Sequence, residues 1–181
     1  MVARVLSVII ILTFFVMPSA AGERRGHDHK EHGHEAHEHG AANLSVLVDG
    51  KTLEIELHVP GADIVGFEHS AESDNDRAAV ARALRTLREN AKLFSPSEAA
   101  GCQITEAHAE YGKDQQYKAD DAHRGFETHR IYTCKSPDRL EYIDVGLFQK
   151  FQTLKEVDAA VVGPRGQRGQ ELTPNDSRLK L

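Results

Sequence analysis

Apolar and polar residues alternate strictly between residues 44 and 59, on both sides of an Asp49-Gly50 pair. The alternating apolar residues are Leu44, Val46, Val48, Leu53, Ile55, Leu57 and Val59. Asp-Gly between two alternating runs is typical of a two-residue hairpin turn. Closing the hairpin on Asp49-Gly50 predicts residue 48 opposite 51, 46 opposite 53 and 44 opposite 55. All the apolar side chains then lie on one face, so the pattern predicts a half-buried hairpin.

The polar positions of the second predicted strand share the opposite, outer face. They are Glu54, Glu56 and His58. If the predicted pairing continues toward the N-terminus, Asn43 lies opposite Glu56 and Ala41 opposite His58. His39 then emerges on the same face, so the segment that precedes the hairpin is delivered to Glu56 and His58. The alternative is an ordinary solvated strand face.

A helix is predicted from Ser73 to about Phe94. Ser73 followed three residues later by Asp76 forms a capping-box pattern. Apolar residues then recur at helical spacing, at Val80, Ala83, Leu84, Leu87 and Ala91. Ser95-Pro96-Ser97-Glu98 repeats the capping pattern with proline at the first helical position, and predicts a short second helix that Gly101 ends.

The second half of the chain favours strands. Strands are predicted at about 102–110, 126–134, 139–147 and 157–161, with a short one near 170–173. Residues 112–125 are predicted to form a polar loop. Ser136-Pro137-Asp138 is predicted to be a turn that joins the strands at 126–134 and 139–147 into a hairpin. Residues 148–154 suit a helical turn, and Gly163 to Gly169 reads as a basic, glycine-rich loop.

Strands dominate this pattern, and no βαβ alternation is present. We therefore expect the α+β class, with a single domain, a mainly antiparallel sheet, one main helix and a disordered His-rich N-terminal arm. The predicted parts are a signal peptide (1–21), the metal-binding arm (22–40), the α+β domain (41–174) and a polar tail (175–181).

The first 21 residues have the features of an export signal. Arg4 precedes an apolar run from Val5 to Met17, and Ser19-Ala20-Ala21 places small residues before a cleavage point at Gly22. The alternative is an uncleaved anchor, but the run is short for a bilayer span. We therefore expect a periplasmic protein with no stable membrane insertion after cleavage. The net charge of −6 argues against a nucleic-acid partner.

The chain has two cysteines, Cys102 and Cys134. An exported protein lies in an oxidising compartment, which favours a disulfide between them. The alternative is a cysteine-containing metal site.

Six of the eleven histidines lie in the arm, at His27, His29, His32, His34, His37 and His39. They form the unit H-x-H-x-x three times, with acidic residues between them. Neutral imidazole binds borderline metal ions, and carboxylates can complete the shell. We predict Zn²⁺, with Cu²⁺ or Ni²⁺ as less favoured ions. The alternative is a solvated polar linker or a remnant of an expression tag.

Histidines of the predicted domain are further candidate ligands for an ordered metal site: His58, His69, His123 and His129. For each of them, a surface or hydrogen-bonded histidine is the competing interpretation. The H-E-x-x-H and G-x-S-x-G motifs are absent from the sequence, and a disulfide leaves no cysteine nucleophile. No catalytic constellation is visible, so we predict that the protein is not an enzyme.

The sequence also resembles the ZrgA-type periplasmic zinc-binding proteins, over nearly all of the mature chain. The resemblance is carried by the run HEHGAANLSVLVDGKTLEIELHVPGADIVGFEH, the KLF that ends the helix, QIT after a cysteine, His123 and Phe126 before YTC, and LFQKFQTLKEVDAAVVGPRGQ. The FEH segment and the two cysteines are its more specific parts. Where the family tends to have an acidic residue between His123 and Phe126, this chain has Arg124-Gly125.

The resemblance implies a periplasmic protein that binds zinc and assists zinc acquisition or buffering. We expect the arm to capture Zn²⁺ and an ordered site on the domain to hold it or pass it on. Partners implied by this role are a zinc-uptake transporter or its periplasmic binding protein. The alternatives are a metal-dependent hydrolase of the cell envelope, which needs an open coordination position beside a base, and an envelope adaptor that binds no metal.

Overall fold

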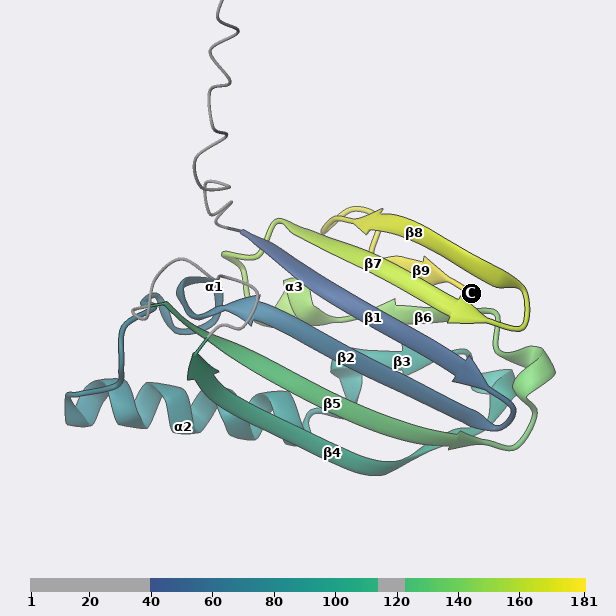
Figure 1. The fold of residues 1–181 in the computed structure, drawn as a ribbon, viewed down its shortest axis with the longest axis horizontal. Helices are drawn as coiled ribbons and strands as arrows, with labels where there is room; N and C mark the ends of the chain where they lie inside the picture. Colours follow the sequence, from purple (N-terminus) through teal and green to yellow (C-terminus); the bar gives the residue numbers. More distant parts are fainter. Residues whose placement is uncertain (1–39, 114–122) are drawn as a thin grey trace, which may run out of the picture. The chain divides into compact units, whose positions relative to one another are not determined.

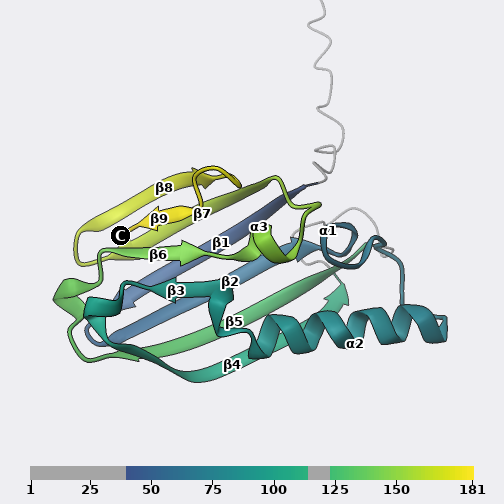
Figure 2. The same cartoon turned by 180° about the vertical axis from the view of Figure 1, so that it is seen from behind.

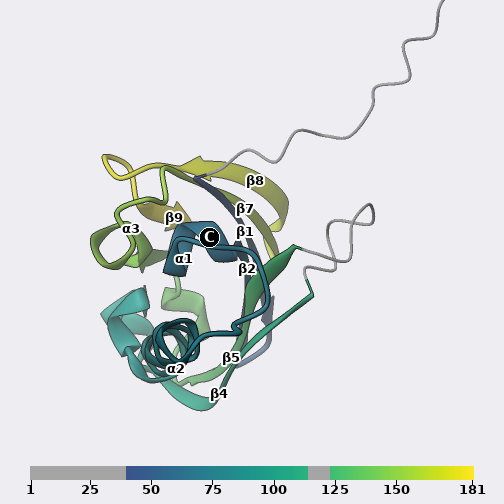
Figure 3. The same cartoon turned by 90° about the vertical axis from the view of Figure 1, so that its left-hand side faces the viewer.

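The computed structural model describes residues 40–113 and 123–181. The predicted signal peptide, nearly all of the predicted arm and most of the polar loop before β5 lie outside these ranges. Seen edge-on, the described residues form two layers (Figure 3). One layer is a large sheet, and the other holds the helices and a small sheet. The prediction of a single α+β domain with a mainly antiparallel sheet and one main helix is confirmed.

The large sheet has six strands in the order β4-β5-β2-β1-β7-β8 (Figure 1). Its strands are β1 (Ala41–Asp49), β2 (Thr52–Pro60), β4 (Cys102–Lys113), β5 (Arg124–Cys134), β7 (Glu156–Gly163) and β8 (Gly166–Leu172). Strands β1 and β7 run parallel, and the other neighbouring pairs are antiparallel. Alternate side chains point to opposite faces of such strands, so each strand offers one face to the core and one to solvent.

The second layer covers the inner face of the large sheet (Figure 2). It contains α1 (Gly61–Val65), α2 (Asp74–Glu89), α3 (Leu147–Lys150) and a small sheet of β3 (Phe94–Pro96), β6 (Tyr142–Val145) and β9 (Arg178–Lys180). Short 3₁₀ turns lie at Ala91–Leu93, Glu98–Ala100 and Pro137–Arg139. The core between the layers is aliphatic and aromatic. Its fully buried members include Leu53, Ile55 and Leu57 of β2 and Leu87 of α2. The outer face of the large sheet therefore stays free for polar chemistry.

The first hairpin forms as predicted, but its register differs by two residues. Asp49 pairs with Thr52, so the turn residues are Gly50 and Lys51, rather than Asp49 and Gly50. Gly50 has φ +56°, a left-handed conformation that glycine adopts without strain. Because the register differs by an even number of residues, every side chain still points to its predicted face of the sheet. The outer-face partners change, however: Ser45 lies opposite Glu56, and Asn43 lies opposite His58.

Helix α2 begins where the sequence predicts and ends earlier. The Ser73 side chain accepts a hydrogen bond from the Asp76 backbone N–H, and the Asp76 carboxylate accepts one from the Ser73 backbone N–H. These hydrogen bonds with Ser73, the side-chain bond foremost, lower the pKa of Asp76. The helix ends at Glu89 rather than near Phe94, because Asn90 caps it in an extended conformation. Leu93 and Phe94 still reach the core, from a 3₁₀ turn and a strand.

Replacing Ser73 with alanine should lower the free energy of unfolding by about 1 kcal/mol, the usual contribution of a serine cap. Because the folded-state pKa of Asp76 is lowered, its part of the capping box stabilises above the ordinary carboxyl pKa and is lost as pH falls. The difference between Ser73→Ala and the wild type should therefore shrink in acid. Urea unfolding at pH 7 and pH 3 measures both effects. Asn75→Ala, an exposed change in the same first turn, is the control. An equal loss in the control would contradict the cap.

Four predictions for other segments are wrong. Ser95 and Pro96 lie in β3 and form no capping box, although a short 3₁₀ turn that Gly101 ends does follow them. Ser97 precedes that turn, but its hydroxyl donates to the Arg139 carbonyl and accepts from the Glu141 N–H. The predicted hairpin after β5 does not form, since β5 already pairs with β2 and β4, and β6 pairs with β3 and β9. The predicted loop at 163–169 includes a tight turn and most of β8, an edge strand. The predicted polar tail contains β9, whose Leu179 is fully buried.

The predicted disulfide is confirmed. Cys102 and Cys134 are bonded, and they lie directly opposite one another where β4 and β5 pair. The bond therefore fixes the register of the two strands on one side of the outer-face histidines. Among the described residues, no helix has the length and apolar content to cross a bilayer.

Candidate metal site

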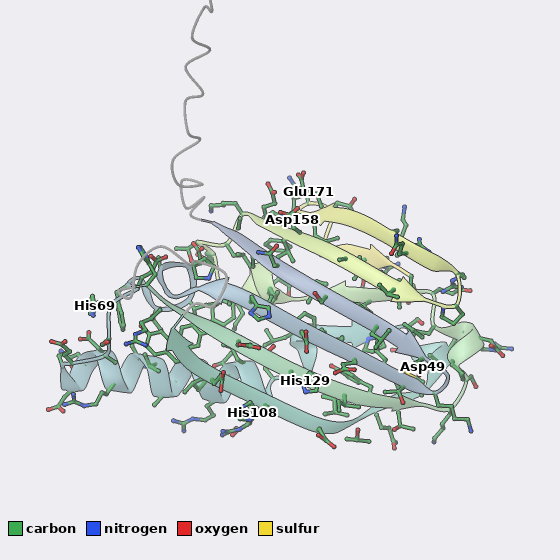
Figure 4. All side chains as sticks on the ribbon, viewed as in Figure 1. Asp49, His69, His108, His129, Asp158 and Glu171 are labelled. Atoms are coloured by element: carbon green, nitrogen blue, oxygen red, sulfur yellow. A yellow bond between two sulfur atoms is a disulfide. The ribbon has the colours of Figure 1, made fainter. Side chains whose placement is uncertain are left out.

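The outer face of the large sheet gathers histidine and glutamate side chains from three neighbouring strands. Strand β2 contributes Glu54, Glu56 and His58, strand β5 contributes Glu127 and His129, and strand β4 contributes His108 and Glu110. The pairing places Glu56 and His108 on either side of His129. Figure 4 shows His108 and His129 together on this face, with Asp49 at one end of the sheet and Asp158 and Glu171 on its other strands.

Glu54, Glu56 and His129 form the tightest of these groups. One potential ligand atom from each residue lies within 4.8 Å of the other two. The Nε2 atom of His129 contacts Glu54 Oε1 directly, and both side chains are about one-third exposed, at 34% and 32%. An imidazole and two carboxylates are a ligand set that Zn²⁺ accepts. The position on an open sheet face leaves room for a further ligand from outside the group.

Two looser pairs flank this group. The Nε2 atom of His58 lies 3.8 Å from Glu127 Oε1, and Nε2 of His108 lies 3.7 Å from Glu110 Oε2. Both separations exceed an ordinary hydrogen bond. Strands β2, β5 and β4 therefore carry three imidazole–carboxylate pairs on one surface.

His69 and His123 lie elsewhere, beside α1 and the start of β5. The Nδ1 atom of His123 lies 2.6 Å from Glu68 Oε2, and the side chains are 29% and 15% exposed. Nδ1 of His69 lies 2.8 Å from the Ser70 carbonyl oxygen, which can only accept, so this nitrogen carries the proton. Nε2 of a neutral His69 is then the metal-ligating atom. The His69 ring stacks on Phe67, at 4.6 Å between centroids.

Arg124 fills the position where an acidic residue was expected. Its guanidinium donates to the Ser70 hydroxyl, and its backbone N–H donates to the Glu68 carbonyl. It contributes a cation beside Glu68 and His123 rather than a ligand. The outer sheet face is therefore the better candidate metal site.

The predicted site residues thus separate into two places on the domain. His58 and His129 lie on the outer sheet face, whereas His69 and His123 lie at the end of the sheet near α1. The six arm histidines, His27 to His39, lie outside the described residues. Sequence reasoning did not single out His108, Glu110 or Glu127. The alternation within their strands marks them as outward-facing, but nothing local shows that β4 and β5 come to lie beside β2.

The predicted boundary between the arm and the domain, at residue 40, needs a correction. Gly40 is buried and belongs to the folded domain rather than to the arm. Its N–H donates to Asp63 Oδ2 at 3.0 Å, and its carbonyl accepts from the N–H groups of Lys155 and Glu156. Gly40 has φ +97°, and a Cβ there would lie 3.2 Å from the Lys155 side chain. The chain that carries the arm histidines is thus fixed at the start of β1.

A family model described as "ZrgA family zinc uptake protein" matches residues 36–181, which include every described residue. A comparison with curated proteins found no match.

Proposed function

Because the chain belongs to the ZrgA family of zinc uptake proteins, we propose that it is an exported, non-enzymatic protein that captures Zn²⁺ in the periplasm. It would hold the ion for a zinc-uptake transporter or its periplasmic binding protein. The disulfide between Cys102 and Cys134 supports an oxidising compartment.

The observation that carries this proposal is the group of Glu54, Glu56 and His129 on the outer sheet face. Its mixed nitrogen and oxygen ligands suit zinc, and the one-third exposure of His129 and Glu54 allows the ion to enter and leave. A deeply buried site would release its ion slowly, which suits a structural role better than transfer. The geometry therefore supports a carrier or buffer.

The arm supplies the capture step in this proposal. Gly40 anchors it at the start of β1, next to β2 in the sheet. Residues 27–39 hold six histidines on a chain that can extend about 3.3 Å per residue. That reach exceeds the distance of about five residues along β1 that separates Gly40 from Ser45, which lies opposite Glu56. The arm is therefore long enough to pass a captured ion to the sheet face.

The neighbourhood of the site favours binding over hydrolysis. A hollow of about 340 Å³ lies beside Glu54 and Glu56, and it is also lined by Ser45, Val46, Leu47, Ala160 and Val162. Apart from Ser45, the polar side chains among these described residues are the two glutamates assigned to the metal, which leaves among them no separate general base to activate a nucleophile. We therefore propose that metal binding itself, rather than metal-assisted catalysis, is the activity.

Replacing His129 with alanine should weaken domain zinc binding by at least about 100-fold. Loss of an outer-shell partner alone costs about 10–100-fold, and His129 is a direct ligand here. The measurement is calorimetric titration with Zn²⁺ of the full chain, in a background whose six arm histidines are glutamine. Glu54→Gln should have a similar effect. Glu171→Gln removes a charge from the same face, four strands from β5, and serves as the control.

Unchanged affinity in both His129→Ala and Glu54→Gln would contradict the sheet-face site. Unchanged stoichiometry after replacement of the arm histidines would contradict the role of the arm.

A further inference from the structure

We infer that the outer sheet face holds a second cation site, formed by His58, Glu127 and Glu110, with His108 at its edge. This inference rests on the proposed function and extends it, because it makes the domain a carrier of two Zn²⁺ ions.

The strand register brings these side chains into one row. Glu127 of β5 lies directly opposite His58 of β2 on one side and Glu110 of β4 on the other. The first site includes the neighbouring row, in which His129 lies opposite Glu56 and His108. Successive side chains on one face of a strand are about 7 Å apart. Two ions about 7 Å apart, one in each row, would each have their own ligands. His108 lies in the row of His129 but close to Glu110, so it can bind either ion.

One separation within the row, and one between the row and its edge residue His108, fit a shared metal better than a direct contact. Ligand atoms at 2.0–2.2 Å from a tetrahedral Zn²⁺ lie about 3.3–3.6 Å apart. The His58–Glu127 and His108–Glu110 pairs, at 3.8 and 3.7 Å, are within a few tenths of an ångström of that separation. A direct hydrogen bond would need 2.7–3.2 Å. Among the described residues, only Glu54, Glu56 and His129 form a group of three whose potential ligand atoms already lie within 4.8 Å of one another. The second site therefore closes only when its exposed side chains rotate around an ion.

The charges in the row also favour a cation. Glu110 and Glu127 are like charges on directly opposite positions of paired strands, an arrangement that costs stability. A divalent ion between them removes the repulsion and gains both carboxylates as ligands. Asp158 and Glu171 are also opposite like charges, at the other end of the same row. Their neighbour along the row, on the side of His58, is Asn43 rather than a histidine. Within the described part of the chain, this second acidic pair therefore has no imidazole beside it and provides a matched control.

The second site should be the weaker of the two. His58 is exposed to the same extent as His129, at 35% against 34%, but Glu127 is 40% exposed, and Glu110 and His108 are 56% and 71% exposed. More exposed ligands compete with water and lose more side-chain entropy when an ion orders them. We expect the mixture of imidazole and carboxylate to take Zn²⁺ in preference to the hard ions Ca²⁺ and Mg²⁺.

The test counts bound zinc in the full chain with the six arm histidines replaced by glutamine. Equilibrium dialysis against Zn²⁺ alone should give two equivalents. His58→Ala combined with Glu127→Gln should remove one equivalent and leave the tighter ion, and His129→Ala should remove the tighter ion and leave the weaker. Asp158→Asn combined with Glu171→Gln removes two carboxylate charges from the same row, one more than the His58 and Glu127 variant removes. It should nevertheless leave both ions in place. Circular dichroism of each variant confirms that the sheet is intact.

Each result decides between the two proposals. One equivalent in the background, lost in His129→Ala and kept in the His58 and Glu127 variant, would overturn the second site and leave the proposed function standing. No equivalent in the background would overturn both. Loss of one equivalent in the Asp158 and Glu171 variant would show that diffuse negative charge, rather than ligation at His58 and Glu127, holds the second ion, and would also overturn the inference.

Discussion

Replacing both Cys102 and Cys134 with serine should lower the free energy of unfolding by about 3–4 kcal/mol. The bond joins residues 32 positions apart, and closing a loop of that length restricts the unfolded chain by about this amount in the chain-entropy model. For a domain of this size the midpoint of thermal unfolding should fall by roughly 10 °C. Urea denaturation of the variant, and of the wild type with and without reductant, measures the loss.

A matched control lies in the next row of the same strand pair. Gln103 and Thr133 face one another beside the disulfide, and both are exposed. Replacing both with alanine changes the same strand ends without opening the loop, so stability should change by less than about 1 kcal/mol. Equal losses in the two double variants would contradict the contribution assigned to the bond. Two reactive thiols in protein recovered from the periplasm would contradict the bond itself.

The disulfide also matters for the metal site. Pairing of β4 with β5 places His108 and Glu110 beside His129 and Glu127, and a shift of one residue would turn each of them toward the core. The bond between Cys102 and Cys134 holds that register in place, next to an irregularity between Ile104 and Glu106. The same covalent link thus stabilises the fold and aligns ligands from two strands.

The sequence predicts side-chain faces better than it predicts neighbours. Alternation placed Glu54, Glu56 and His58 on the outer face, and a register error of two residues left that assignment correct because side chains alternate with period two. The contact of His129 with Glu54 was out of reach, since it joins strands 75 residues apart. No local pattern encodes which distant strand pairs with β2. The sequence therefore singled out Glu54, Glu56 and His129 separately, but it did not predict that they lie together.

Strand β8 shows why some elements escape prediction. Gly166 to Gly169 are exposed at the edge of the sheet, so no alternation of apolar and polar residues marks them. Their pairing with β7 supplies the structure. Arg130 is the opposite case, a charged residue that is fully buried on the inner face of β5. Its guanidinium donates to the Leu87 carbonyl near the end of α2 and lies over the Phe94 ring, 5.5 Å from its centroid. These partners come from the second layer.

Zinc affinity of the whole chain should fall steeply between pH 7.5 and 5.5, by an amount that counts the imidazoles on each ion. An imidazole binds metal only when it is deprotonated, and the pKa of a free histidine side chain is about 6.5. Protons and Zn²⁺ therefore compete as pH falls, and each imidazole ligand weakens binding by about tenfold across this range. Aspartate and glutamate titrate near pH 4 and contribute little to the change.

The two parts of the protein should consequently respond differently. An ion held by three imidazoles should lose about 1,000-fold in affinity, whereas an ion held by one imidazole and two carboxylates should lose about tenfold. Competition with a chromophoric zinc chelator at pH 7.5, 6.5 and 5.5, on the wild type and on the variant with arm glutamines, separates the two. A flat profile in both proteins would mean that carboxylates alone hold the zinc. An equally steep profile in both would place the histidine-rich shell on the domain, where His58, His108 and His129 are the nearest set.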